Sequence, residues 1–244
     1  MARRGNGSGI AHATANGYIA ALMRQAPLLV LAALLAPAGQ AEVQAYRLAQ
    51  GKEGPGITLS LPYTFGTHED RVLRVSGELR MDPDSPQSVS GTLRVPIDAI
   101  ASDSKERDCH MREALGIDYS RSQYPREHIC KDDRLPAAAV AYSEISLQIE
   151  GAQAPPVTAM SVGKESPVSV HGLWTIHGVT RPARLQLAAS RDAKTPGALR
   201  LRGKSEVRLS DFGVVVKSAQ VLFVTSSVGE VATVQLDLVL VPSR

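Results

Sequence analysis

Cysteine and histidine are the residues of this chain that are best suited to carry chemistry. Cys109-His110 and His128-x-Cys130 could together offer two sulfur and two nitrogen ligands to zinc. Their spacing matches no common zinc motif, and in an oxidising compartment the two thiols would pair with each other. We therefore expect no metal site. We expect instead a disulfide between Cys109 and Cys130, which would stabilise the fold by ~3 kcal/mol.

The usual signatures of catalysis and of cofactor binding are missing from the sequence. No Gly-x-Ser-x-Gly elbow is present to hold a nucleophilic serine. Asp108-x-His110 pairs an acid with a base, but residues two apart on a helix do not share a face. No glycine-rich phosphate loop follows a strand, and the Cys-x-x-Cys-His haem motif is absent, so we expect no cofactor. We predict a protein that is not an enzyme; the alternative is a small hydrolase with His110 or His177 as its base.

The first 41 residues differ in character from the rest of the chain. They contain Arg3, Arg4 and Arg24 and no acid, so the formal charge of +3 belongs to them, and 24 basic and 24 acidic residues remain. An apolar run at 27–36 is followed by small residues that end at Ala41. This pattern predicts a signal peptide at 1–41, with an uncleaved membrane anchor as the alternative, and a domain at 42–244.

Two expectations about the environment of the protein follow from that leader. The domain should be periplasmic or secreted once the leader has been removed. Because the positive charge belongs to the leader, the domain carries no excess of basic residues, and nucleic acid is excluded as a partner.

Most of the remaining chain has the period-two alternation of β-strands, and the fold class is mainly all-β. Aromatic residues make up only 4% of the chain, so any core must be aliphatic. Turns separate short alternating runs, which is typical of a sandwich or a barrel, and a closed barrel would leave no edge strand. We expect strands within 42–48, 57–65, 71–81, 89–97, 138–149, 172–187, 199–207 and 232–240.

One segment has a helical period instead. Asp103 is a candidate N-cap, Glu106 would complete a capping box, and Gly116 would end a helix that spans 105–115. Met111 and Leu115 lie on one face of it, so this short helix should cover an apolar surface. Its charged residues Arg107, Asp108 and Arg112 form either a solvated face or the polar rim of a cavity.

The clearest hairpin turns at His177-Gly178, where a tight turn needs positive φ. On its dry face lies Trp174, the only tryptophan of the chain. If the barrel is hollow, alternation and the position of the helix predict which side chains would contact a guest. These candidates are Phe65, Leu93, Val95, Met111, Leu115, Trp174, Ile176, Leu187 and Leu236. The alternative is a structural envelope protein whose barrel is filled by its own side chains.

Four stretches, in this order, resemble the YceI-like family of polyisoprenoid-binding proteins. They are Val89-Ser90-Gly91-Thr92-Leu93-Arg94-Val95, the helix 105–112 with Arg-Asp-x-His, Thr175-Ile176-His177-Gly178-Val179-Thr180-Arg181-Pro182, and Ser210-Asp211-Phe212-Gly213. The resemblance implies an antiparallel lipocalin-like β-barrel with one short helix covering it. It also implies a bound isoprenoid or other long-chain lipid, such as a polyprenyl alcohol or a quinone. Such a carrier would touch membranes transiently and act as a monomer or homodimer.

Overall fold

The computed structural model describes most of the chain after residue 42. The described residues are 43–51, 54–123, 130, 135–154, 160–216, 219–221 and 224–243. The signal peptide expected at 1–41 therefore lies outside them, and so does His128. No helix in the described part of the chain is long and apolar enough to cross a membrane.

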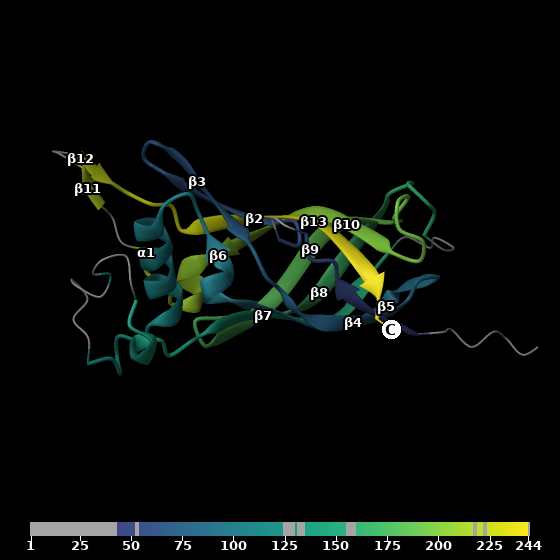
Figure 1. Cartoon of the computed structure of the whole chain (residues 1–244), viewed down its shortest axis with the longest axis horizontal. Coiled ribbons are helices and arrows are strands. Elements are labelled where there is room, and N and C mark those ends of the chain that lie inside the picture. Colours follow the sequence, from purple (N-terminus) through teal and green to yellow (C-terminus); the bar gives the residue numbers. More distant parts are fainter. Residues whose placement is uncertain are drawn as a thin grey trace, which may run out of the picture. The chain divides into compact units, whose positions relative to one another are not determined.

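Eight antiparallel strands close into a barrel, as the alternation and the family resemblance predict (Figure 1). In order around the ring they are β1 (Gln44–Leu48), β4 (Ser76–Asp82), β5 (Ser85–Pro96), β7 (Glu144–Gln153), β8 (Ser166–Ile176), β9 (Val179–Arg191), β10 (Leu199–Arg208) and β13 (Val231–Pro242). The ring closes where β1 pairs with the end of β13, Leu48 opposite Leu240. Closure leaves none of these eight strands with a free edge along its whole length.

Strand β13 is longer than its partner β1. The residues of β13 that do not pair with β1 extend the sheet to three further strands. The first residues of β13 pair with β2 (Ile57–Tyr63), which is followed by β3 (Gly66–Val72) and β6 (Ile100–Ala101). The single strand expected at 71–81 is therefore wrong. The chain leaves β3 after Val72 and enters β4 at Ser76, because β3 pairs with β2 whereas β4 pairs with β1 and β5.

Smaller elements join or flank the strands. The 3-10 turns are η1 (Ile97–Ala99), η2 (Ala137–Ala139) and η3 (Leu209–Phe212), and β11 (Ala219–Val221) pairs with β12 (Val224–Ser226). The strand expected from residue 138 begins only at Glu144, because η2 forms first. In that turn the N–H of Ala139 donates to the carbonyl of Pro136 at 2.9 Å.

Helix α1 (Lys105–Gly116) lies where the sequence predicts it, but Ser104, not Asp103, is its N-cap. The hydroxyl of Ser104 accepts a hydrogen bond from the Arg107 backbone N–H at 3.3 Å. Asp103 instead forms an ion pair with the Arg107 side chain. The predicted Cys109–Cys130 disulfide is present, with its Cα atoms 5.8 Å apart, and ties the segment after the helix back to it.

The β8–β9 hairpin holds the far end of α1. His177 (φ 51°) and Gly178 (φ 74°) form the predicted tight turn. The ring of His177 contacts the carbonyl of Ile117, just beyond the helix, at 2.9 Å through Nε2, and packs against Tyr142. A Cβ at position 178 would lie 2.4 Å from the Tyr142 ring, so glycine is required here for space as well as for φ.

Candidate ligand-binding cavity

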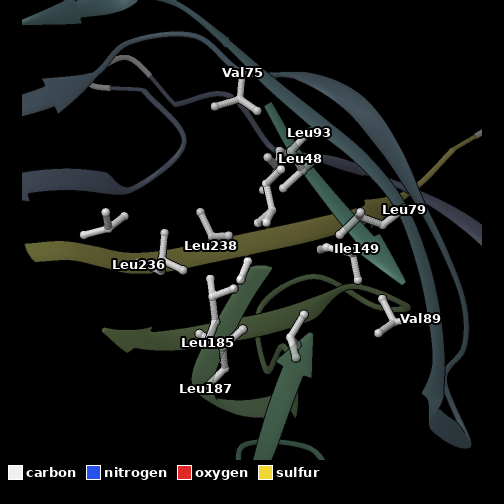
Figure 2. Packing of buried hydrophobic residues seen from close by; sticks show 14 of the residues in the cluster. Leu48, Val75, Leu79, Val89, Leu93, Ile149, Leu185, Leu187, Leu236 and Leu238 are labelled. Atoms are coloured by element: carbon white, nitrogen blue, oxygen red, sulfur yellow. The ribbon is translucent and has the colours of Figure 1, made fainter. Parts of the chain in front are cut away.

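The inward side chains of the barrel do not meet at its centre. They surround a cavity of about 580 Å³, a volume typical of sites for small ligands. Figure 2 shows Leu79, Val89, Ile149, Leu185 and Leu238 pointing inward from different strands. These strands include opposite and adjacent members of one closed ring, and the side chains that they contribute to the lining are aliphatic. The alternative of a barrel filled by its own side chains does not fit this cavity.

Eight of the nine residues predicted to contact a guest line this cavity. They are Leu93, Val95, Met111, Leu115, Trp174, Ile176, Leu187 and Leu236. The exception is Phe65, whose placement was predicted wrongly. The strand ends at Tyr63, so Phe65 falls in the turn before β3, is 58% exposed and packs edge-on against the Tyr63 ring. Ligand contact by the other eight stays a prediction.

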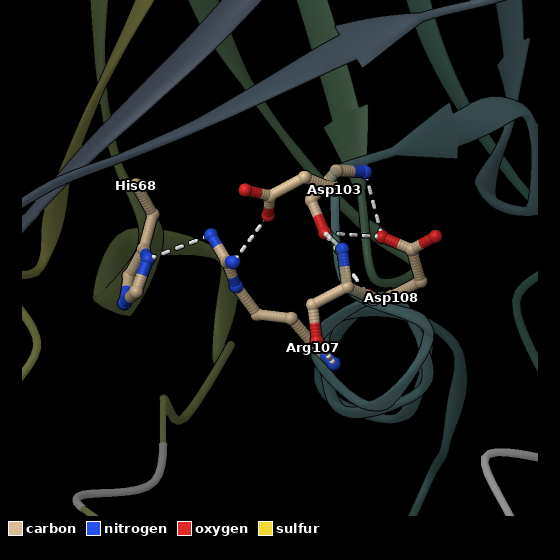
Figure 3. A network of polar contacts seen from close by, with 6 residues as sticks. His68, Asp103, Arg107 and Asp108 are labelled. Carbon is tan, nitrogen blue, oxygen red and sulfur yellow. Dashed lines mark hydrogen bonds and ion pairs between the residues drawn. The ribbon is translucent and has the colours of Figure 1, made fainter.

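The cavity has a polar end formed by β3 and α1 (Figure 3). Arg107 donates from Nη1 to Nδ1 of His68 at 3.0 Å, and its other terminal nitrogen pairs with Asp103. His68 also stacks on Tyr63, with ring centroids 3.9 Å apart. Burial, and then the charge of Arg107, lower the pKa of His68, while Asp103 raises it to a smaller extent. His68 is therefore neutral at pH 7, with its proton on Nε2.

Asp70, two residues along β3, faces the same cavity and is 9% exposed. Its carboxylate accepts no hydrogen bond from any side chain or turn in the described ranges. Burial raises the pKa of Asp70, Arg107 lowers it, and Asp108 and Asp103 raise it further. A buried carboxylate without a partner is costly, so this residue is the least expected feature of an otherwise aliphatic wall.

A second polar group comes from the last turns of α1 and the segment behind it. Glu113, only 2% exposed, lies 3.1 Å from Nδ1 of His110 through Oε2 and accepts a hydrogen bond from the Tyr119 hydroxyl at Oε1. All three residues line the cavity. The exposed residues His110 and Val215 also line it, so the cavity reaches the surface beside α1.

Comparison with known proteins now decides the family. A sequence model of the YceI-like domain matches residues 57–240. The chain belongs to the YceI-like family. This membership agrees with the motifs from which the resemblance was inferred and with the closed barrel.

Two solved structures share this YceI-like fold. A polyisoprenoid binding domain from Saccharophagus degradans, implicated in plant cell wall breakdown, has 12% sequence identity and a TM-score of 0.54 over 83% of this chain and 100% of that one. BcnA from Burkholderia cenocepacia has 13% identity and a TM-score of 0.50 over 75% and 95% of the two chains. At such identities the likeness concerns the fold. A search of curated proteins finds no match.

The three charged residues of α1 that the sequence analysis singled out have two different roles in this YceI-like chain: one faces the cavity, and two anchor the helix. Arg107 belongs to the rim of the cavity, as one of the two interpretations of the sequence expects. Asp108 instead accepts from the backbone N–H and hydroxyl of Ser102, both at 2.7 Å, and Arg112 donates to the carbonyl of Asp98 at 3.3 Å. These two residues hold the helix against the segment that leads into it.

One group of side chains has the donor atoms of a metal site. His110, Glu113 and Cys130 place their donor atoms within 4.8 Å of one another. The sulfur of Cys130 is bonded to Cys109, however, and a disulfide sulfur is not the thiolate that zinc requires. This set is therefore unsuited to a metal while the bridge is intact.

Four polar residues of the cavity were not predicted from the sequence: His68, Asp70, Glu113 and Tyr119. For the first two, the sequence offers only a weak signal, which is their place four and two residues before the apolar Val72. In β3, His68, Asp70 and Val72 are the more buried residues, whereas Thr67, Glu69 and Arg71 are exposed. Because charged and polar residues occupy both faces of this strand, its hydrophobicity pattern does not show which face points inward.

Proposed function

We propose that this YceI-like chain is an exported binding protein that holds a long-chain amphiphilic lipid, an isoprenoid, inside its barrel for storage or transport. The observation that carries the proposal is the cavity of about 580 Å³ with its nearly continuous aliphatic lining. The YceI-like domain fits a lipid-binding barrel. The polyisoprenoid-binding name of the Saccharophagus degradans domain supports an isoprenoid as the guest.

The chemistry of the lining suits such a guest. A hydrocarbon chain gains ~0.8 kcal/mol for each methylene group removed from water, and it needs no hydrogen bonds in return. The walls contributed by β5, β7, β9 and β13 supply leucine, isoleucine and valine side chains. The polar part of the guest would then lie near α1, where His68, Asp70 and Arg107 face the cavity.

A lipid carrier must exchange its guest with a membrane, and the mouth of the cavity offers apolar residues for that contact. Val215 lines the cavity and is 70% exposed. Phe65 is exposed on the neighbouring β2–β3 turn, where Tyr63 pairs with Val228, another residue of the cavity wall. In this proposal Phe65 and Val215 touch the membrane surface transiently while the guest passes.

Binding without catalysis is the better proposal because the described lining of the cavity offers no hydroxyl or thiol nucleophile of the serine, threonine or cysteine type. Among the described residues, no serine, threonine or cysteine lines it. His110, the base of the alternative hydrolase, is paired with Glu113. His177 is not part of the lining, and its Nε2 contacts the carbonyl of Ile117. A screen of ester substrates against the wild type, His110→Ala and His177→Ala should show no turnover that depends on either histidine.

The identity of the guest is open to direct measurement. The protein is purified from its native host, extracted with organic solvent, and the extract is analysed by mass spectrometry. The proposal predicts one lipid class in close to equimolar amount to the protein. An extract that holds only traces of mixed membrane lipids, at the level of an unrelated periplasmic protein, would contradict it.

A further inference from the structure

Asp70 combines two properties that are rarely found together in a protein wall. It is nine-tenths buried, and its carboxylate has no hydrogen-bond partner among the described residues. Its cross-strand neighbour on β2 is Leu59, which also lines the cavity. Its oxygens are not sealed in protein, since they are not among the fully buried side-chain atoms that lack a partner, so they are accessible from the cavity and can accept a hydrogen bond from a molecule that enters it.

Glu113, the other buried carboxylate of the cavity, is in a different situation. It already accepts a hydrogen bond from Tyr119 and is paired with His110. Glu113 is therefore committed to protein side chains, which makes Asp70 the acceptor with capacity for a ligand.

The charges around Asp70 limit what that ligand can be. Arg107 is the one permanently cationic side chain among the described cavity residues, and it is already bonded to His68 and paired with Asp103. The carboxylates of Asp103 and Asp108 act on Asp70 together with Arg107, and Glu113 lies farther along α1. Negative charges outnumber the single arginine, so an anionic head group beside Asp70 would be repelled.

We propose that Asp70 accepts a hydrogen bond from the head group of the guest. The cavity would then prefer isoprenoids with a hydroxyl, amide or amine head over those with a carboxylate or phosphate head. This selectivity rests on the proposed function, because it needs the tail of the guest to lie in the barrel. The competing reading is that Arg107 recruits an anionic head despite its existing partners.

The test compares ligands that share one tail. Geranylgeraniol, geranylgeranoate and geranylgeranyl phosphate displace a fluorescent apolar reporter from the full, delipidated protein. The alcohol should bind at least about tenfold more tightly than either anion. In Asp70→Asn and Asp70→Leu the anions should gain affinity because the negative charge is gone, and in Asp70→Leu the alcohol should also lose affinity because no acceptor remains, so in both variants the preference should fall at least about tenfold.

The outer face of the same strand supplies a matched control. Glu69→Gln removes one negative charge from the exposed residue that precedes Asp70, and it should leave the preference unchanged. A wild-type preference for the phosphate or the carboxylate, or a preference that survives both Asp70 variants, would overturn the inference while leaving lipid binding intact. If none of the three ligands displaces the reporter, the proposed function itself fails and the inference with it.

Discussion

Nη1 of Arg107 lies 3.0 Å from Nδ1 of His68, and this contact joins helix α1 to strand β3 across the polar end of the cavity (Figure 3). The helix covers the cavity and the strand forms part of its wall. The pair therefore links the cover to the barrel. Burial of the ring, and then the charge of Arg107, lower the pKa of His68, because protonation at Nδ1 would place a second cation against the guanidinium.

The first prediction concerns pH. The pKa of His68 is lowered in the fold, so the unfolded chain binds a proton more readily than the native one. The stability supplied by neutral His68 is present above pH ~6.5 and is lost as the pH falls through the lowered native pKa. His68→Gln should flatten this part of the stability–pH curve, measured by urea unfolding. An unchanged curve would show that His68 does not titrate differently in the two states.

The second prediction concerns the stability of the Asp70 variants. Burial raises the native pKa of Asp70, so its charge opposes folding at pH 7, and this cost fades as the pH falls through the raised native pKa towards the ordinary pKa of an aspartate. Asp70→Asn should raise the free energy of unfolding at pH 7 by about 1 kcal/mol, and the gain should shrink at low pH. Glu69→Gln should have little effect. A destabilised Asp70→Asn would mean that the carboxylate has a partner within the protein.

The third prediction concerns the Cys109–Cys130 bridge, which closes 21 residues of chain. Replacing both cysteines with serine should lower the free energy of unfolding by ~3 kcal/mol, and reduction of the wild type should have a similar effect. Thiol labelling of the native, unreduced protein should detect no free thiol. Stoichiometric labelling at two sites would contradict the bridge.

The fourth prediction concerns the leader, residues 1–41. The run of small residues that ends at Ala41 predicts cleavage before Glu42 in the exported protein. The intact mass of the protein recovered from the periplasm or the medium should equal that of residues 42–244 with one disulfide. A mass that retains the leader would favour the uncleaved anchor.

Alternation predicts most of the aliphatic wall correctly, although it joins β3 and the start of β4 into one strand. Trp174 and Ile176 lie on one dry face beside the tight turn at His177-Gly178, and this local pattern places them in the wall. Helix α1 was predictable for a similar reason, since its apolar residues recur at helical spacing. Its N-cap was displaced by one residue, because Asp103 and Ser104 are both good caps and only the fold selects between them.

The polar end of the cavity could not be predicted in the same way. A buried acid such as Asp70 or Glu113 has the sequence signature of an exposed residue, and only the pairing of β3 with β2 shows that Asp70 faces inward. Phe65 illustrates the opposite error. An aromatic residue was expected to be inside, but the strand ends two residues earlier and leaves it on the surface.

The central claim, that the barrel is a container for lipid, is tested most directly by placing a charge inside it. Ile176→Asp puts a carboxylate into the cavity wall, whereas Gln186→Asp puts one on the exposed face of the neighbouring strand β9. Both variants and the wild type are purified from the native host, and their bound lipid is measured per mole of folded protein. The account predicts that Gln186→Asp retains the lipid content of the wild type and that Ile176→Asp retains less than about a tenth of it. Equal lipid content in a folded Ile176→Asp protein would show that the guest does not occupy this cavity.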